Sequence, residues 1–364
     1  MPTNSIEELT RLLPCQTGFL ITAPVSRRFL TGFDSSDGML FLSQKECVFL
    51  TDSRYIEAAK ERIAICPVEE FRDPRKQLRA LCKRNKIRRL QLELSKTNLM
   101  EASNYQNWLW DSTRVVTGRH RFWGALTSER LLEINLKRLR RAKTPEQADC
   151  VRRAQRIAEA ALTAVLQNDF REGVTERELA LALDFHMLRN GAEALSFETI
   201  VVAGENGSRP HGVPGGRPLR GGDFVTMDFG AVVDGWHSDM TRTTALDGID
   251  EEQRKIYGTV LAAQRAALDR IRPGVACKEV DAAARRVIEE AGYGEYFRHG
   301  AGHGVGLEIH EAPTLSSKSE DILAPGDIVT VEPGIYLPGK CGVRIEDMAL
   351  VTEDGYENLT QAAK

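Results

Sequence analysis

The sequence contains an internal duplication, which restricts the possible folds more than any other feature. The tetrapeptide R-E-G-V at 171–174 recurs as R-P-G-V at 272–275, and each copy opens an amphipathic helical pattern that ends near a glycine. The segment 222–230 recurs as 326–334 in the form G-D-apolar-V-T-apolar-acid-x-G. The offsets of 101 and 104 residues are far longer than the period of solenoid repeats. We therefore predict one α/β (α+β) domain made of two αα-ββ halves related by a pseudo-two-fold axis.

The chain has 364 residues, which is too long for one ordinary core and suits two domains. Residues 1–125 alternate short apolar runs with helical stretches, which is typical of a mixed α/β domain. We place a linker at 126–143 and the duplicated domain at 144–364. In the first domain we expect strands at 18–22, 38–42 and 47–51, a half-buried strand at 89–94, and helices at 52–62 and 74–85.

Two capping patterns mark the first helices of the duplicated domain. Thr144 can cap a helix, Pro145 suits the first helical position, and Gln147 completes a capping box. We expect this helix to run to about Asn168. A second capping box at 175–178 predicts the start of the next helix.

Each half ends its apolar strand with a carboxylate, Asp228 or Glu332, and then turns and returns with a second acid, Asp239 or Glu346. A hairpin in each half would bring its two acids side by side, and the pseudo-two-fold would bring the two pairs together. Four carboxylates at one point repel strongly unless cations lie between them. The pattern therefore predicts a metal site, whereas any one acid taken alone could be a solvated turn residue.

The histidine distribution supports a metal site. His299, His303 and His310 lie within twelve residues, in a glycine-rich stretch that allows backbone and imidazole to approach a ligand closely. Four carboxylates with one imidazole favour Mn²⁺, Co²⁺, Fe²⁺ or Zn²⁺ over Ca²⁺, because a nitrogen ligand is present. Three other histidines receive no role in the site: His120, His186 and His237.

The overall charge points to neither nucleic acid nor a membrane as a partner. The formal net charge is -3, which offers no strong field to attract a polyanion or an anionic surface. Basic stretches at 83–89 and 137–143 are interpreted as solvated helix faces, with a nucleic-acid patch as the alternative.

The cysteine pattern suits a cytoplasmic protein. The seven cysteines are odd in number and widely spaced, and no C-x-x-C occurs, which argues against a disulfide framework and a thiolate zinc site. The first residues lack the pattern of a signal peptide, and no apolar run approaches the length of a transmembrane helix. We expect a soluble protein with reduced thiols.

Several motifs together resemble one known family. The motifs are H-G (211–212), M-D-F-G (227–230), S-D-M-T-R-T (238–243), H-G-V-G-L-E-I-H-E (303–311), V-E-P-G-I-Y (331–336) and G-V-R-I-E-D (342–347). They resemble the pita-bread metallopeptidases, and most closely the prolidase and aminopeptidase P branch. The resemblance covers residues from about 140 to the end. It implies a pita-bread catalytic domain preceded by a small creatinase-like N-terminal α/β domain, which methionine aminopeptidases lack.

The resemblance also implies a role for each site residue. Asp228 would chelate one of two divalent ions with both oxygens, Asp239 and Glu346 would bridge the ions, and His303 and Glu332 would bind the second. The ions would be Mn²⁺ or Co²⁺, with Zn²⁺ or Fe²⁺ as alternatives. The remaining roles are substrate handling by His211, His299 and His310, orientation of the bridging acids by Arg344, and a place close to the site for Tyr336.

The activity implied by the resemblance is removal of an N-terminal residue that precedes proline. A water held between two cations has its pKa lowered toward neutral, so that hydroxide is available as the nucleophile. His310 or His211 could stabilise the oxyanion, and Glu332 or a histidine could carry the proton to the leaving nitrogen. The alternatives are an Xaa-Pro dipeptidase and a disabled binding protein, although none of the ligands has been lost. The branch usually forms homodimers.

Overall fold

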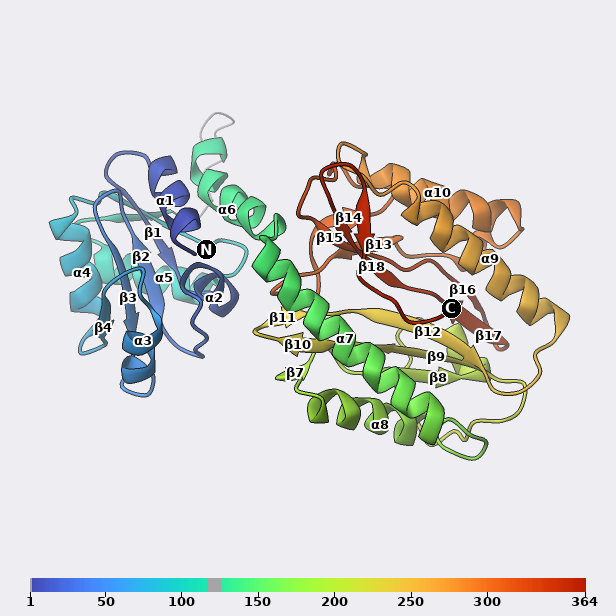
Figure 1. Cartoon of the computed structure of the whole chain (residues 1–364). Coiled ribbons are helices and arrows are strands. Elements are labelled where there is room, and N and C mark those ends of the chain that lie inside the picture. The colour runs from blue at the N-terminus through green and yellow to red at the C-terminus, as the bar shows by residue number, and fades with distance from the viewer. Residues whose placement is uncertain (1, 117–125) are drawn as a thin grey trace. The chain divides into compact units, whose positions relative to one another are not determined.

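The computed structural model describes residues 2–116 and 126–364, which divide into two compact units with the boundary between Arg140 and Arg141 (Figure 1). His120 lies outside the described residues. The stretch interpreted as a linker carries a helix, α6 (Leu126–Arg141). In the described parts of the chain, no helix is both long enough and apolar enough to cross a membrane.

The first unit is built on one mixed six-stranded sheet in the order β4-β3-β2-β1-β5-β6. β1 pairs antiparallel with β2 and parallel with β5. The three strands expected first are confirmed within one residue at each end. The elements of this unit are α1 (Pro2–Leu12), β1 (Thr17–Ile21), α2 (Pro24–Thr31), β2 (Met39–Leu42), β3 (Cys47–Thr51), α3 (Ile56–Arg62), β4 (Val68–Glu70), α4 (Pro74–Arg84), β5 (Arg89–Leu92), α5 (Leu99–Leu109) and β6 (Arg114–Val116).

The strand expected at 89–94 differs from the prediction in length and burial. It ends at Leu92, and Leu90, Gln91 and Leu92 are all buried, so the expectation of a half-buried strand is wrong. β5 lies inside the sheet, between β1 and β6, and both of its faces are covered. The alternation in the sequence therefore reports the polarity of Gln91 rather than exposure to water.

The second unit consists of two halves, each with a pair of helices packed on strands. Helices α7 and α8 share a buried core with β8, β9 and β12, whereas α9 and α10 share another with β15, β17 and β18 (Figure 1). Both capping boxes form as predicted, at Thr144 and at Thr175. The helices are α7 (Pro145–Asn168), α8 (Glu176–Arg189), α9 (Glu251–Leu268) and α10 (Cys277–Glu290), with 3₁₀ turns η1 (Gly204–Ser208) and η2 (Gly294–Tyr296).

In each half, an antiparallel strand pair supports the acids of the site. β9 pairs antiparallel with β12, and β15 pairs antiparallel with β18. The strands of the first half are β7 (Ala194–Leu195), β8 (Ile200–Ala203), β9 (Phe224–Phe229), β10 (Ala231–Val233), β11 (Trp236–His237) and β12 (Met240–Ala245). Those of the second are β13 (Gly302–Gly304), β14 (Glu311–Leu315), β15 (Ile328–Val331), β16 (Gly334–Leu337), β17 (Cys341–Arg344), β18 (Asp347–Val351) and β19 (Tyr356–Asn358).

The duplicated turns adopt the same backbone conformation in both halves. Gly173 and Gly274 have φ angles of 87° and 83°, which glycine adopts without the steric penalty of a Cβ atom. The N–H of Gly173 donates to the carbonyl of Leu219 at 3.0 Å, and the N–H of Gly274 donates to the carbonyl of Leu323 at 2.8 Å. The repeat in the sequence is therefore a repeat in structure, down to single hydrogen bonds.

Gly302 provides a test of the packing between β13 and β15. A Cβ atom at this position would overlap the backbone carbonyl of Thr330, so Gly302→Ala should lower the free energy of unfolding by about 1–3 kcal/mol. Gly258 is the matched control, because it is exposed within α9 and a Cβ there meets nothing within 4 Å. Gly258→Ala should raise the free energy of unfolding by roughly 0.5–1 kcal/mol. Urea unfolding that gave both variants the same sign would contradict this account.

Candidate metal centre

All ten residues that the sequence analysis assigned to the site line one cavity of about 500 Å³ in the second unit. The expected ligands are Asp228, Asp239, His303, Glu332 and Glu346, and the other five are His211, His299, His310, Tyr336 and Arg344. The described histidines without an assigned role do not line this cavity. His186 lies 3.9 Å from Asp169 on the α8 side, and His237 Nδ1 is 2.8 Å from Ser196 Oγ.

The strand register determines how the four acids meet. β9 and β12 place Thr241 opposite Asp228, so Asp239 lies two residues away, diagonal to Asp228 on the same face. β15 and β18 place Val331 opposite Asp347, and one further step along this register brings Glu332 level with Glu346. The two halves therefore supply their second acid from different positions.

This register makes the duplication asymmetric at the site. If Asp228 and Glu332 are equivalent, then Thr241 is the equivalent of Glu346, because each stands opposite that acid. Two residues earlier along the chain, Asp239 is then the equivalent of Arg344. Each half returns with a second acid, but Asp239 and Glu346 are not equivalent positions, and the connection from the first acid to its opposite residue is one residue longer in the second half.

The potential ligand atoms of these side chains lie close to one another. Nε2 of His303 lies 3.5 Å from Oδ2 of Asp239 and 3.5 Å from Oε1 of Glu332. One ligand atom each from Asp239, His303 and Glu346 lie within 4.8 Å of one another. Nδ1 of His303 is 3.0 Å from the carbonyl of Gly304. Donation of the Nδ1 proton to that carbonyl leaves Nε2 with a lone pair that faces the carboxylates.

Two buried oxygens in the site lack a hydrogen-bond partner among the described residues. They are Oδ1 of Asp228 and Oε1 of Glu346. A buried carboxylate oxygen without a donor carries a large desolvation penalty, which a cation removes. The oxygen-rich donor set with one imidazole suits a divalent transition metal, so the residues present fit the metal that the sequence analysis expected.

The pKa shifts have the same origin. Burial, reinforced by the charge of Glu346, raises the pKa of Asp239 well above its usual range. Burial and the charge of Glu332 do the same to the pKa of Glu346, and burial raises the pKa of Glu332. Burial lowers the pKa of His303, which keeps the imidazole neutral, as a metal ligand must be.

Arg344 and Thr241 orient the acids from one side. Arg344 Nη2 donates to Oδ2 of Asp228 at 2.6 Å, and its Nε donates to Oγ1 of Thr241 at 3.0 Å. The hydroxyl of Thr241 in turn donates to Oε2 of Glu346 at 2.7 Å. In the described structure Arg344 thus holds Asp228 directly and reaches Glu346 through Thr241.

The remaining histidines lie at different depths in the cavity. His299 Nε2 is 3.0 Å from the hydroxyl of Tyr336, which also accepts from Arg344 at 2.9 Å. The ring of His310 stacks edge-on to His303 with centroids 4.3 Å apart. Burial lowers the pKa of His299 and of His310. His211 is exposed at the cavity wall.

Two threonines that support the acids were not predicted from the sequence. Thr241 contacts Glu346, as described above, and Oγ1 of Thr330 accepts from the N–H of His303 at 3.0 Å and donates to Oε1 of Glu332 at 3.3 Å. Thr330 belongs to the duplicated G-D-apolar-V-T motif, so the recurrence of this threonine in both copies could have marked it as a candidate site residue.

A buried ion pair beside the site was also missed. Lys143 Nζ lies 2.5 Å from Oε1 of Glu311, with both side chains almost completely buried. Glu311 directly follows His310, so this pair fixes the end of the loop that carries His310. The residues are 168 positions apart, and nothing in the local pattern indicates that they meet.

The raised carboxyl pKa values predict how the metal-free protein responds to pH. Folded-state pKa values above the unfolded ones mean that the folded chain binds more protons, so stability is present at low pH and is lost as pH rises. The melting temperature in chelator should fall as pH rises above the ordinary carboxyl range of about 4 to 4.5. Mn²⁺ should restore most stability at the highest pH. Glu346→Gln removes one of these acids and should flatten the dependence; an identical profile with and without chelator would contradict the prediction.

The chain matches known proteins over both units. Residues 149–353 match metallopeptidase family M24, and residues 17–119 match the creatinase/prolidase N-terminal domain. An Xaa-Pro dipeptidase of Pyrococcus furiosus is 44% identical over 229 residues, which are 63% of this chain and 66% of that protein.

Solved structures match along the whole chain. An Xaa-Pro dipeptidase from Bacillus anthracis is 35% identical with a TM-score of 0.91, covering 100% of this chain and 99% of that one. An X-Pro aminopeptidase from Thermotoga maritima is 31% identical with a TM-score of 0.88, covering 98% of each chain. The predicted creatinase-like domain followed by a pita-bread catalytic domain is confirmed, as is the prediction of a hydrolase. The chain is a peptidase of metallopeptidase family M24.

Proposed function

We propose that this peptidase removes an N-terminal residue that precedes proline, and that it uses two divalent ions to do so. The observation that carries the proposal is a cavity whose lining includes four carboxylates and the His303 imidazole. Apolar side chains of Phe197, Ile200 and Ile309 line the same cavity. A proline ring needs such a surface, because proline lacks the N–H by which other residues are usually held.

The metal ligands in this proposal are the five side chains at the base of the cavity. Asp228 would hold one ion, Asp239 and Glu346 would bridge, and His303 and Glu332 would hold the other. Mn²⁺ or Co²⁺ is the proposed metal, with Zn²⁺ or Fe²⁺ as alternatives. When bound, such ions polarise a carbonyl and lower the pKa of a water held between them. The two unpaired oxygens, on Asp228 and Glu346, support this assignment.

The histidines of the cavity would handle charge and protons. His310 lies beside His303, lines the cavity and is exposed, so its N–H can point at the oxyanion that forms from the scissile carbonyl; His211 is the alternative. Glu332 has a raised pKa, which suits a group that takes a proton and passes it to the leaving nitrogen. His299 is fixed by Tyr336 and would orient the substrate.

The charge of the cavity supports action on peptides longer than a dipeptide. Among the described residues lining it, Arg344 is the only arginine or lysine, and its donors already serve Asp228, Thr241 and Tyr336. The free carboxylate of a bound Xaa-Pro dipeptide would find no unoccupied guanidinium or ammonium there. A peptide that continues beyond proline carries no charge at that position.

Xaa-Pro dipeptidase activity is the second candidate. An adjoining cavity of about 300 Å³ shares His211, His299 and Tyr336 with the first and adds Arg298, whose exposed guanidinium could hold a terminal carboxylate. Two of the relatives described above are also named Xaa-Pro dipeptidases. Substrate length therefore separates the two candidates.

We also propose a homodimer and a cytoplasmic location. Leu181, Phe185 and Leu188 are 60%, 58% and 48% exposed on one face of α8, an apolar surface that a second copy could cover. Light scattering should give twice the chain mass of 40.5 kDa.

All seven cysteines are free thiols, which supports a reducing compartment and hence the cytoplasmic location. Recovery of the protein outside the cytoplasm on fractionation would contradict this location.

Metal content measured beside kinetics will separate ligands from proton-handling groups. His303→Ala should lose bound metal together with activity. His310→Ala should keep its metal while the rate falls roughly 10²- to 10⁴-fold, as for a proton-transfer group. His186→Ala is the control and should change neither quantity. If His310→Ala loses metal as fully as His303→Ala, His310 is a ligand and the proposed roles are wrong.

Proline preference can be measured with paired substrates that differ only at the second residue. A pocket that merely tolerates proline would separate Pro from Ala by roughly 10–200-fold in kcat/KM, and we expect a preference at or above the upper end of that range. Equal or faster cleavage of the Ala peptide would indicate a general aminopeptidase. Tripeptides Xaa-Pro-Yaa should be cleaved, whereas cleavage confined to Xaa-Pro would favour the dipeptidase.

A further inference from the structure

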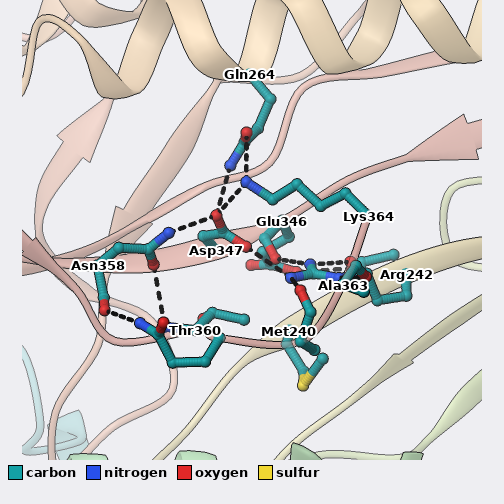
Figure 2. Close-up of polar contacts among 12 residues, drawn as sticks. Met240, Arg242, Gln264, Glu346, Asp347, Asn358, Thr360, Ala363 and Lys364 are labelled. Atoms are coloured by element: carbon teal, nitrogen blue, oxygen red, sulfur yellow. Dashed lines mark hydrogen bonds and ion pairs between the residues drawn. The ribbon is translucent and has the colours of Figure 1, made fainter.

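A buried polar network adjoins Glu346 and joins residues of β12 and β18 to the last residues of the sequence (Figure 2). Glu346, the residue before β18, lines the cavity, whereas Asp347, the first residue of β18, does not and is buried in this network. Arg242 follows Thr241 on β12. Arg242 is 2% exposed and Asp347 is fully buried, and neither has a role in the function proposed above.

Arg242 uses all five of its N–H donors. Nη1 donates to the carbonyl of Glu346 at 2.6 Å and to that of Thr241 at 3.0 Å. Nη2 donates to Oδ1 of Asp347 at 2.9 Å and to the carbonyl of Ala362 at 2.7 Å, and Nε donates to the carbonyl of Ala363 at 2.9 Å. One guanidinium therefore joins the backbone of a proposed metal ligand to residues 362 and 363.

Asp347 closes the other side of the network. Its Oδ2 accepts from Gln264 at 3.0 Å and from Asn358 at 2.8 Å, and Lys364 Nζ lies 2.5 Å away (Figure 2). Lys364 also donates to Oε1 of Gln264 at 2.9 Å. Two cations thus share one buried carboxylate, and the Lys364 side chain is 18% exposed.

The backbone of Glu346 is held at both ends of the residue. Its N–H donates to the carbonyl of Thr241 at 3.1 Å, and its carbonyl accepts from Arg242. A ligand to a metal ion must be positioned within roughly 0.5 Å, which requires that its supports be rigid as well. The position of the Glu346 carboxylate therefore depends on where Arg242 is held.

We infer that Arg242, Asp347 and Lys364 are positioning residues for the metal centre, with Lys364 completing the network that fixes Glu346. The inference rests on the proposed function, since it takes Glu346 to be a metal ligand. Its physical basis is the chain of contacts from Lys364 through Asp347 and Arg242 to the Glu346 carbonyl. Loss of the ammonium loosens Asp347 and residues 362–363, and with them the guanidinium that anchors Glu346.

Lys364→Met in the full chain is the test, because it keeps the length of the side chain and removes only its charge. The dissociation constant for Mn²⁺ is measured by competition with a chelator, beside the melting temperature of the metal-free protein. We expect Mn²⁺ to bind about 10-fold more weakly, the lower end of the range for residues that support metal ligands. The visible spectrum of the Co²⁺ form should change as well, whereas Lys364→Arg should restore both properties.

Lys340→Met is the matched control. Lys340 pairs with Glu252 at 3.0 Å but is 62% exposed and lies outside the network, so Mn²⁺ affinity should not change. Should Lys364→Met prove too unstable to titrate, Asn358→Ala removes another donor to Asp347 and should weaken Mn²⁺ binding in the same direction. A lower melting temperature with unchanged Mn²⁺ affinity would overturn the inference, leaving the network a purely structural feature. Glu346→Gln distinguishes failure of this inference from failure of the proposed function. Unchanged Mn²⁺ affinity in that variant would refute the proposed metal site itself.

Discussion

The mutual repulsion of four carboxylates around one cavity is the constraint on which the rest of the second unit depends. Two unit charges 4 Å apart interact by about 4 kcal/mol at an effective dielectric constant of 20, so even one unscreened pair is comparable to much of a domain's stability. The protein brings Asp228, Asp239, Glu332 and Glu346 together nonetheless. Hydrogen bonds from Arg344 and Thr241 offset part of the repulsion, and bound protons or cations offset the remainder.

This constraint explains why the site could be predicted from the sequence to the extent that it was. Acids at the ends of apolar strands, histidines in a glycine-rich run and duplicated turns are all local patterns, and they indicated the four acids and three of the histidines that line the cavity. His211, Tyr336 and Arg344, which also line it, were expected only from the family resemblance. The capping boxes at Thr144 and Thr175 were predictable for the same reason, because the residues that form each box lie within one helical turn.

The features that could not be predicted depend on long-range register. Whether Asp239 or Thr241 stands opposite Asp228 follows from the length of the connection, and no local pattern reports it. The pairing of Lys143 with Glu311 joins residues 168 positions apart. The burial of β5 depends on its place between β1 and β6. Sequence periodicity describes one segment at a time, whereas each of these features depends on how two or more distant segments of the chain pack together.

The exact equivalence of Arg242 with Asp347, and of Thr241 with Glu346, has a consequence for how such a molecule can arise. Each pair joins positions related by the pseudo-two-fold, one an ion pair and the other a hydrogen bond. In a dimer of identical half-length chains, each of these positions would meet a copy of itself, arginine against arginine or glutamate against glutamate. Only after fusion into one chain can the two copies mutate separately into complementary partners. The asymmetric centre of this peptidase is therefore accessible to a fused gene and closed to a symmetric dimer of halves.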